Sequence, residues 1–184
     1  MASQNMTDPA LGPALLNALA AGKTAETALS GTVLGRAHID YRQLLVVDAR
    51  GQTAIHSGAQ VLGQWGQAQG VDCAAGGNLL ADASVPQAMV AAFETATGHL
   101  GAQLMLALEA GLALGGEAGP VRSAGLKIAD QLDWPLVDLR IDWADDPIGM
   151  LRAAWDVYRP QMAAYVQRAE NPTQAPSYGV PGDE

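Results

Sequence analysis

The clearest pattern of hydrophobic and polar positions in the chain is a pair of apolar stretches joined by a turn, within residues 41–58. Leu44–Val47 is a continuous aliphatic run that is too short for a helix and is typical of a strand covered on both faces. Asp48–Gly51 supplies turn residues, and Gln52–His56 alternates as a return strand. This pattern predicts a buried β-hairpin, and therefore a layered domain with helices outside the sheets.

Amphipathic stretches with capping residues predict helices on both sides of this hairpin. Asp8–Pro9 is typical of a helix start, and Ser84–Gln87 has the spacing of a capping box. A long apolar face begins at Asp146–Pro147, and Pro160 should kink or break the helix there. The predicted helices span residues 8–22, 24–31, 84–98, 100–115 and a long segment from 146.

Shorter apolar runs complete the predicted element order. Residues 59–70 are rich in Gly and Gln and indicate a loop, whereas Val71–Ala75, Ser123–Ile128 and Leu136–Ile141 indicate strands. Runs of helices that alternate with runs of strands favour an α+β layered sandwich over a doubly wound sheet. We expect one domain over residues 1–170, followed at 171–184 by a Pro-rich arm or disordered tail.

Composition and charge exclude several classes of function. The 184 residues carry a net charge of −9, which argues against nucleic acid or an anionic membrane surface as a partner. The most apolar stretch, Leu104–Leu114, is too short to span a bilayer, and residues 1–7 lack the features of a signal peptide. The sequence therefore predicts a cytoplasmic protein.

Motifs for metals, nucleotides and reactive thiols are missing. His38, His56 and His99 lack metal-ligand spacing, and Cys73 is the single cysteine, so we expect a small buried side chain there. The glycine-rich segment 115–120 follows a helix and lacks the Lys-Ser/Thr pair of a phosphate loop. We therefore expect no metal and no cofactor.

Two polar patterns remain as candidates for chemistry. Asn78 follows two glycines, in a turn that can aim backbone N–H groups and a carboxamide at a site, although a simple turn explains the same residues. Asp138 and Arg140 share one face of a predicted strand, which suits an ion-paired surface.

Several short blocks together resemble one known family. They are Ala2–Gly12, Tyr41–Leu44, Val47–Asp48, Ser57–Gly58, Gly77–Ala81 and Val137–Asp142. In this order they resemble the bacterial family labelled domain of unknown function ten-twenty-eight, from residue 2 to about residue 165. The resemblance implies an Ntn-hydrolase-like protein with a four-layer αββα sandwich.

The chain departs from the family's pattern in three places. The segment before Arg122–Ser123 is altered, and Trp143–Asp146 lacks the family's histidine. Relatives also carry N-terminal strands ahead of the Ala2–Gly12 block. An Ntn nucleophile is an N-terminal Thr, Ser or Cys whose own amine is the base, whereas Met1 and Ala2 cannot attack. We expect either an incomplete stretch of a longer protein or a catalytically silent domain.

Two functions follow from these observations. The first is an Ntn-type amidohydrolase acting on an unidentified small amide or peptide-like substrate, with Ser3, Gln4, Asn78 and Ser123 lining the site. The alternative is a non-catalytic sandwich that binds a small ligand or a partner protein. Aromatic and Met side chains on the long helix and Tyr178 in the arm further predict a homodimer.

Overall fold

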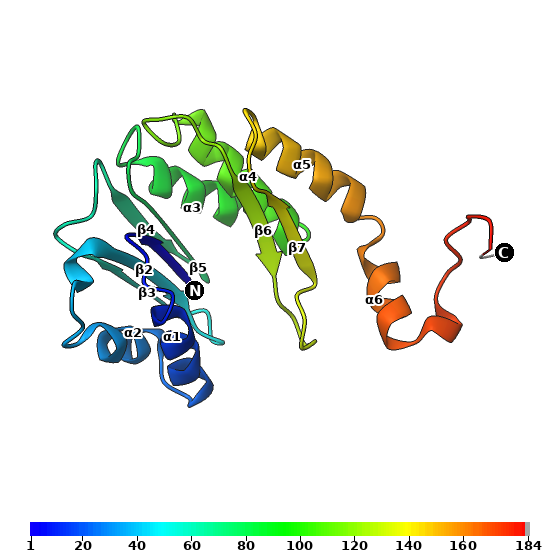
Figure 1. Ribbon diagram of the computed structural model, residues 1–184, viewed down its shortest axis with the longest axis horizontal. Helices are drawn as coiled ribbons and strands as arrows, with labels where there is room; N and C mark the ends of the chain where they lie inside the picture. Colours follow the sequence, from blue (N-terminus) through cyan, green and yellow to red (C-terminus); the bar gives the residue numbers. More distant parts are fainter. Residues whose placement is uncertain (183–184) are drawn as a thin grey trace. The chain divides into compact units, whose positions relative to one another are not determined.

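The computed structural model describes residues 1–182 as six α-helices and three small antiparallel sheets, so the protein belongs to the α+β class (Figure 1). The chain divides into two compact units, Met1–Val121 and Arg122–Glu184. The boundary lies inside the predicted single domain of residues 1–170, which stays a prediction. Residues 183 and 184 of the predicted arm lie outside the described part.

The predicted hairpin forms the centre of the first sheet in unit 1. β2 (Arg42–Val47) pairs with β3 (Thr53–Ser57), and Gly51 takes φ 78° in the turn, as its position predicts. β1 (Ala2–Asn5) adds a third antiparallel strand on the other side of β2. The sequence did not predict β1, because a polar four-residue segment carries no apolar alternation.

The second sheet of unit 1 lies in the segment that was partly predicted as a loop. β4 (Gly66–Gly70) pairs with β5 (Cys73–Gly77) through a turn in which Asp72 takes φ 59°. The loop prediction for residues 59–70 was therefore wrong at its end, and the predicted strand at Val71–Ala75 is shifted by two residues. The residues GQAQG have low strand propensity, so pairing and packing, not local preference, form this strand.

Helices cover the outer faces of these two sheets. α1 (Leu11–Ala20) and α2 (Ala25–Val33) pack on the first sheet, in a core that includes Leu15 and Leu44. α3 (Val85–Thr95) packs on β4 and β5, and α4 (Leu100–Ala113) packs on α3. The helical hairpin predicted around Gly98 is confirmed.

The two sheets of unit 1 lie directly against each other. β2 and β3 contact β5, and a methyl group at Gly76 would come within 3.1 Å of Leu45 and 3.4 Å of the Gln43 carboxamide carbon. A side chain at this position would push the Leu45 and Gln43 side chains aside, so glycine favours the close approach. Gly76 therefore allows the two sheets to pack closely, whereas a methyl group at Gly77 would meet the Leu80 side chain.

The helix starts agree with the predicted caps in part. Thr24 and Asp146 accept hydrogen bonds from the backbone N–H groups of Thr27 and Gly149, as N-cap residues do. The helix start predicted at Asp8 is three residues early, because α1 begins at Leu11, although the Asp8 carboxylate accepts a hydrogen bond from the Ala10 backbone N–H at 3.0 Å. The capping-box bond at Ser84 is missing, because this hydroxyl donates to the Asp82 carboxylate instead.

The described part of unit 2, up to residue 182, contains one β-hairpin, two helices and a short 3-10 turn. β6 (Ala124–Ile128) pairs with β7 (Val137–Ile141), and α5 (Pro147–Tyr158) packs on both strands with Trp155 only 1% exposed. α6 (Met162–Glu170) follows after a break at Pro160, as predicted. The strand face of Asp138 and Arg140 is exposed and ion-paired, through Lys127 and Asp142, which agrees with the interpretation as a surface.

The arm after α6 folds back on that helix. A 3-10 turn (Pro172–Gln174) leads to Tyr178, whose ring lies 3.6 Å from the Arg168 guanidinium, and Arg168 also donates to the Pro176 carbonyl at 2.8 Å. Tyr165 and Tyr178 are 43% and 53% exposed, whereas Trp155 is 1% exposed. The predicted homodimer stays a prediction. No helix within residues 1–182 is long and apolar enough to cross a membrane.

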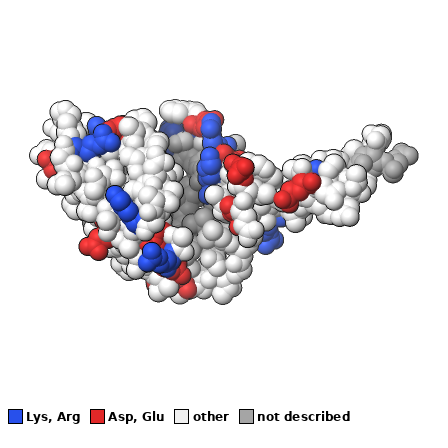
Figure 2. Space-filling view, turned by 90° about the horizontal axis from the view of Figure 1, so that it is seen from below, with Lys and Arg blue, Asp and Glu red and all other residues white. Residues whose placement is uncertain are grey.

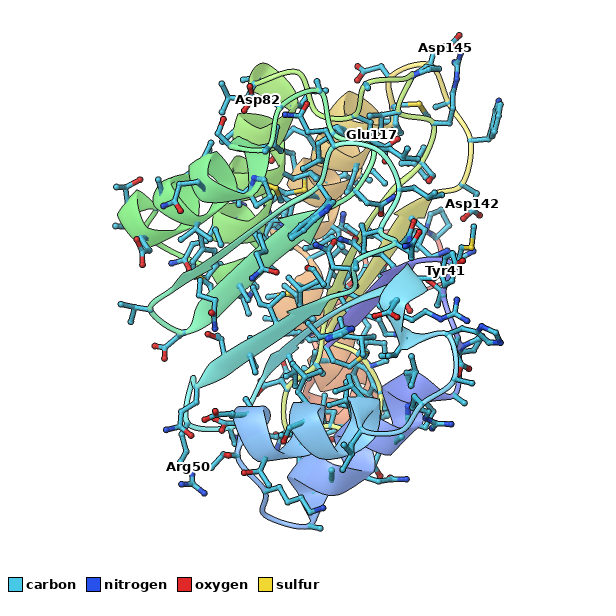
Figure 3. The ribbon with its side chains drawn as sticks, turned by 90° about the vertical axis from the view of Figure 1, so that its left-hand side faces the viewer. Tyr41, Arg50, Asp82, Glu117, Asp142 and Asp145 are labelled. Atoms are coloured by element: carbon cyan, nitrogen blue, oxygen red, sulfur yellow. The ribbon has the colours of Figure 1, made fainter. Side chains whose placement is uncertain are left out.

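Asp48 ties the hairpin turn to the start of α2. Its carboxylate accepts hydrogen bonds from the backbone N–H groups of Arg50 at 2.8 Å, Gln52 at 3.1 Å and Ala25 at 3.1 Å. Partial desolvation alone would raise the pKa of Asp48, but these hydrogen bonds outweigh it and hold the pKa below its ordinary value. Figure 3 shows Arg50 at the end of this hairpin beside the helix.

We expect Asp48→Asn to lower the Tm at pH 7, because an amide N–H then replaces one acceptor oxygen. Since the folded pKa is lowered, this stabilisation is complete above the unfolded pKa of about 4 and is lost as the pH falls through the folded value. Thermal unfolding of both proteins between pH 7 and pH 3 tests this. A difference in Tm that stays constant over this range would contradict it.

Candidate functional site

A network of carboxamides and hydroxyls connects the two sheets of unit 1. Gln43 on β2 is fully buried, accepts a hydrogen bond from Gln4 on β1, and donates to Ser57 Oγ at 2.9 Å and to the Gly66 carbonyl at 3.1 Å. The Ser57 hydroxyl donates in turn to Gln67 at 2.7 Å. The network crosses four strands and satisfies the one fully buried polar side chain among the described residues.

A second pair of carboxamides lies where β1 ends and the turn after β5 begins. Asn78 Nδ2 donates to Asn5 Oδ1 at 3.4 Å, and the same oxygen accepts from the Leu62 backbone N–H at 3.4 Å. Asn5 is anchored because its Nδ2 donates to the Tyr41 carbonyl. Figure 3 shows Tyr41 beside this first strand. Within residues 1–182, Asn5 is therefore fixed, and the Asn78 side chain is held by one long hydrogen bond.

Two residues with unusual backbone conformations occur at this pair. Asn5 takes φ 60°, and Leu79, directly after Asn78, takes φ 54°. The left-handed region is tolerated by Asn but is unfavourable for Leu, at about 1–3 kcal/mol. Such strain gathers at ligand sites, where the surrounding structure holds it in place. The structure therefore marks the Asn5–Asn78 pair as its strongest candidate site.

The predicted site residues do not all lie together. Gln4 and Asn78 both lie in unit 1, Gln4 within the inter-sheet network and Asn78 beside Asn5. Ser3 pairs with Leu44, whose side chain belongs to the core under α1 and α2, so Ser3 faces away from Gln4. The Ser3 hydroxyl is buried and has no hydrogen-bond partner within residues 1–182. Ser123 is exposed and belongs to unit 2.

Residues 1–182 show no metal site and no reactive cysteine that would be a second candidate site. Within the described residues no group of His, Cys, Asp and Glu side chains could hold a metal ion. Burial raises the pKa of the Cys73 thiol, and the nearby Glu94 carboxylate raises it further, so a reactive thiolate is disfavoured there. Figure 2 shows acidic and basic side chains interspersed on the face it presents. A surface depression of about 380 Å³ beside Lys23 and Arg50 contains none of the predicted site residues.

The sequence pointed to Asn78 but missed Asn5 and Gln43. A signal for Gln43 existed, because it directly precedes the aliphatic run Leu44–Val47 and so shares a buried strand with it. A polar residue at such a position needs hydrogen-bond partners. Asn5 carried no comparable signal, because its partners are distant in the sequence.

Comparison with known proteins places the chain in a family. The model of the Family of unknown function (DUF1028) matches residues 1–151. The chain belongs to DUF1028. This confirms the resemblance given by the sequence blocks, and the matched range includes every residue of the inter-sheet network and the Asn5–Asn78 pair.

A solved structure of the same family agrees with this fold. The crystal structure of protein SPO2555 from Silicibacter pomeroyi, also a DUF1028 protein, is 30% identical, with a TM-score of 0.77 over 85% of this chain and 70% of that chain. No protein with a curated description matches the chain significantly. DUF1028 has no known function, so the activity must be argued from the site.

Proposed function

We propose that this DUF1028 chain provides the amide-binding part of an Ntn-type amidohydrolase that acts on a small amide or peptide-like substrate. The observation that carries the proposal is the Asn5–Asn78 pair. Asn5 is held by two contacts, with Leu62 and Tyr41, whereas the Asn78 side chain makes one hydrogen bond of 3.4 Å within the described part of the chain. A bond of this length is near its limit, so Asn78 can turn its N–H toward a ligand with little loss.

Asn78 has the chemistry that an oxyanion site needs. Attack on an amide carbonyl places negative charge on the carbonyl oxygen, and a carboxamide N–H stabilises this charge without a proton transfer. The inter-sheet network behind the pair fixes the strands that carry it, because Gln4 and Asn5 are consecutive on β1. The carboxamide oxygen of Asn78 remains as an acceptor for the N–H group of the substrate.

The packing of unit 1 supports the same class of protein. Two helices, a three-stranded sheet, a two-stranded sheet and two further helices contact one another in that order. This order of contacts supports the αββα sandwich that the family resemblance implies, which we propose for unit 1. In an Ntn enzyme the nucleophile is a Thr, Ser or Cys at the mature N-terminus, whose α-amine accepts the proton during attack.

The mature protein and its turnover provide the test. The gene would be expressed with its native upstream reading frame, and the N-terminus of the purified protein would be sequenced. We expect a mature N-terminal Thr, Ser or Cys and hydrolysis of at least one member of a panel of fluorogenic amides. A mature protein that begins at Met1 and hydrolyses none of the panel would overturn the proposal and favour the non-catalytic binding domain.

Asn78→Ala in the active protein should lower kcat about a hundredfold and change KM much less, because the lost hydrogen bond belongs to the transition state. Steady-state kinetics with the best amide of the panel measure both constants. Asn171→Ala, a change in the arm of unit 2, is the control. Equal kcat values for the wild type and the Asn78→Ala protein would remove the oxyanion role of Asn78.

A further inference from the structure

Two leucines are exposed beside the Asn5–Asn78 pair. Leu62 is 42% exposed and Leu79 is 47% exposed. Their backbones join the pair directly, because the Leu79 N–H donates to the Leu62 carbonyl at 3.1 Å and the Leu62 N–H donates to Asn5 Oδ1 at 3.4 Å. An apolar surface therefore adjoins two carboxamides that can bind an amide.

Leu79 occupies a backbone position that a leucine rarely adopts. Its φ of 54° lies in the left-handed region, where Gly or Asn is far better tolerated. The Leu79 side chain also lies close to the backbone of Gly63. A methyl group at Gly63 would come within 2.8 Å of Leu79 Cδ2. Gly63 itself takes φ 64°. The fold thus accommodates an exposed leucine that contributes little to its own core.

We propose that Leu62 and Leu79 form the subsite that receives an apolar side group of the amide held by Asn5 and Asn78. The inference rests on the proposed function and names the substrate class as small amides with a leucine-sized aliphatic group next to the amide. A bound aliphatic group would cover the two exposed leucines and remove apolar surface from water on both sides. The favourable free energy of burying this apolar surface explains why a strained, exposed leucine is useful at position 79.

Titration of the full chain with two probe amides tests the subsite. N-acetyl-leucinamide and N-acetyl-glycinamide differ only in the aliphatic group, and two-dimensional NMR of the labelled protein follows the side-chain amide signals of Asn5 and Asn78. We expect the leucine probe to bind about tenfold more tightly than the glycine probe, as burial of an aliphatic group predicts. Leu79→Gly should remove this difference without lowering the Tm, because glycine fits φ 54°.

Asp72→Gly is the matched control, because it also places glycine at a left-handed position, φ 59°, in the turn between β4 and β5. It should leave the tenfold preference intact. Equal binding of the two probes to the wild type would overturn the subsite and leave the amide site standing. If neither probe shifts the Asn5 and Asn78 signals, both the subsite and the amide site are wrong. Turnover of other amides would then still support the hydrolase.

Discussion

Replacing Gln43 by alanine is expected to lower the free energy of unfolding of unit 1 by about 3–4 kcal/mol. Gln43 is fully buried, so the substitution leaves a cavity between the two sheets. It also removes a hydrogen-bond partner from the half-buried Gln4 amide, from the Ser57 hydroxyl and from the Gly66 carbonyl. Urea unfolding followed by far-UV circular dichroism measures the change.

Gln69→Ala is the matched control for this prediction. Gln69 also connects the two sheets, through a 2.7 Å hydrogen bond to Thr53, but its side chain is exposed. Water replaces the lost bond there, so we expect a change within about 0.5 kcal/mol. Equal effects of the two substitutions would show that the buried network does not hold the sheets together. Gln43→Met, which nearly keeps the side-chain volume, separates the lost hydrogen bonds from the cavity.

Replacing Trp155 by alanine is expected to destabilise unit 2 by about 3–5 kcal/mol. The indole is 1% exposed and lies on α5, the helix that covers β6 and β7. Unit 2 has a short two-stranded sheet and its α6 contains no buried residue, so few other side chains can fill the space. Amide hydrogen exchange measured by mass spectrometry should show loss of protection in β6 and β7.

Trp143→Ala provides the comparison within the same unit. Trp143 is 78% exposed, and its ring lies 5.8 Å from the Arg122 guanidinium. Exposed contacts of this kind contribute at most about 1 kcal/mol. We therefore expect protection in β6 and β7 to remain. Loss of protection in the Trp143→Ala protein but not in the Trp155→Ala protein would contradict the assignment of the core.

The sequence predicted those elements whose pattern is local. The hairpin at Leu44–Val47, the helical hairpin around Gly98 and the break at Pro160 each follow from residues within one turn or one strand. A proline fixes its own φ and lacks a backbone N–H, and an apolar run indicates a buried element from its own residues. Both signals can therefore be recognised without knowledge of distant contacts. The α+β class could be predicted for the same reason.

The elements that the sequence missed are formed by distant contacts. β1 and β4 contain small or polar residues, and each becomes a strand because a partner strand supplies its hydrogen bonds. The candidate site depends on the same pairing. Asn78 was a candidate because two glycines precede it, but Asn5 reaches it across 73 positions of the chain. No local pattern encodes such a pair.

The chemical composition of the inter-sheet network has a consequence for enzyme kinetics. Its side chains are carboxamides and a hydroxyl, from Gln4, Gln43, Ser57 and Gln67, and none of them gains or loses a proton between about pH 3 and pH 10. The junction of the sheets is therefore electrically constant over the whole range of an assay. An inflection in a pH–rate profile of this protein therefore does not arise from these four side chains. Below about pH 4 the loss of the Asp48 hydrogen bonds contributes to such a profile, whereas between about pH 5 and pH 10 the network itself stays unchanged.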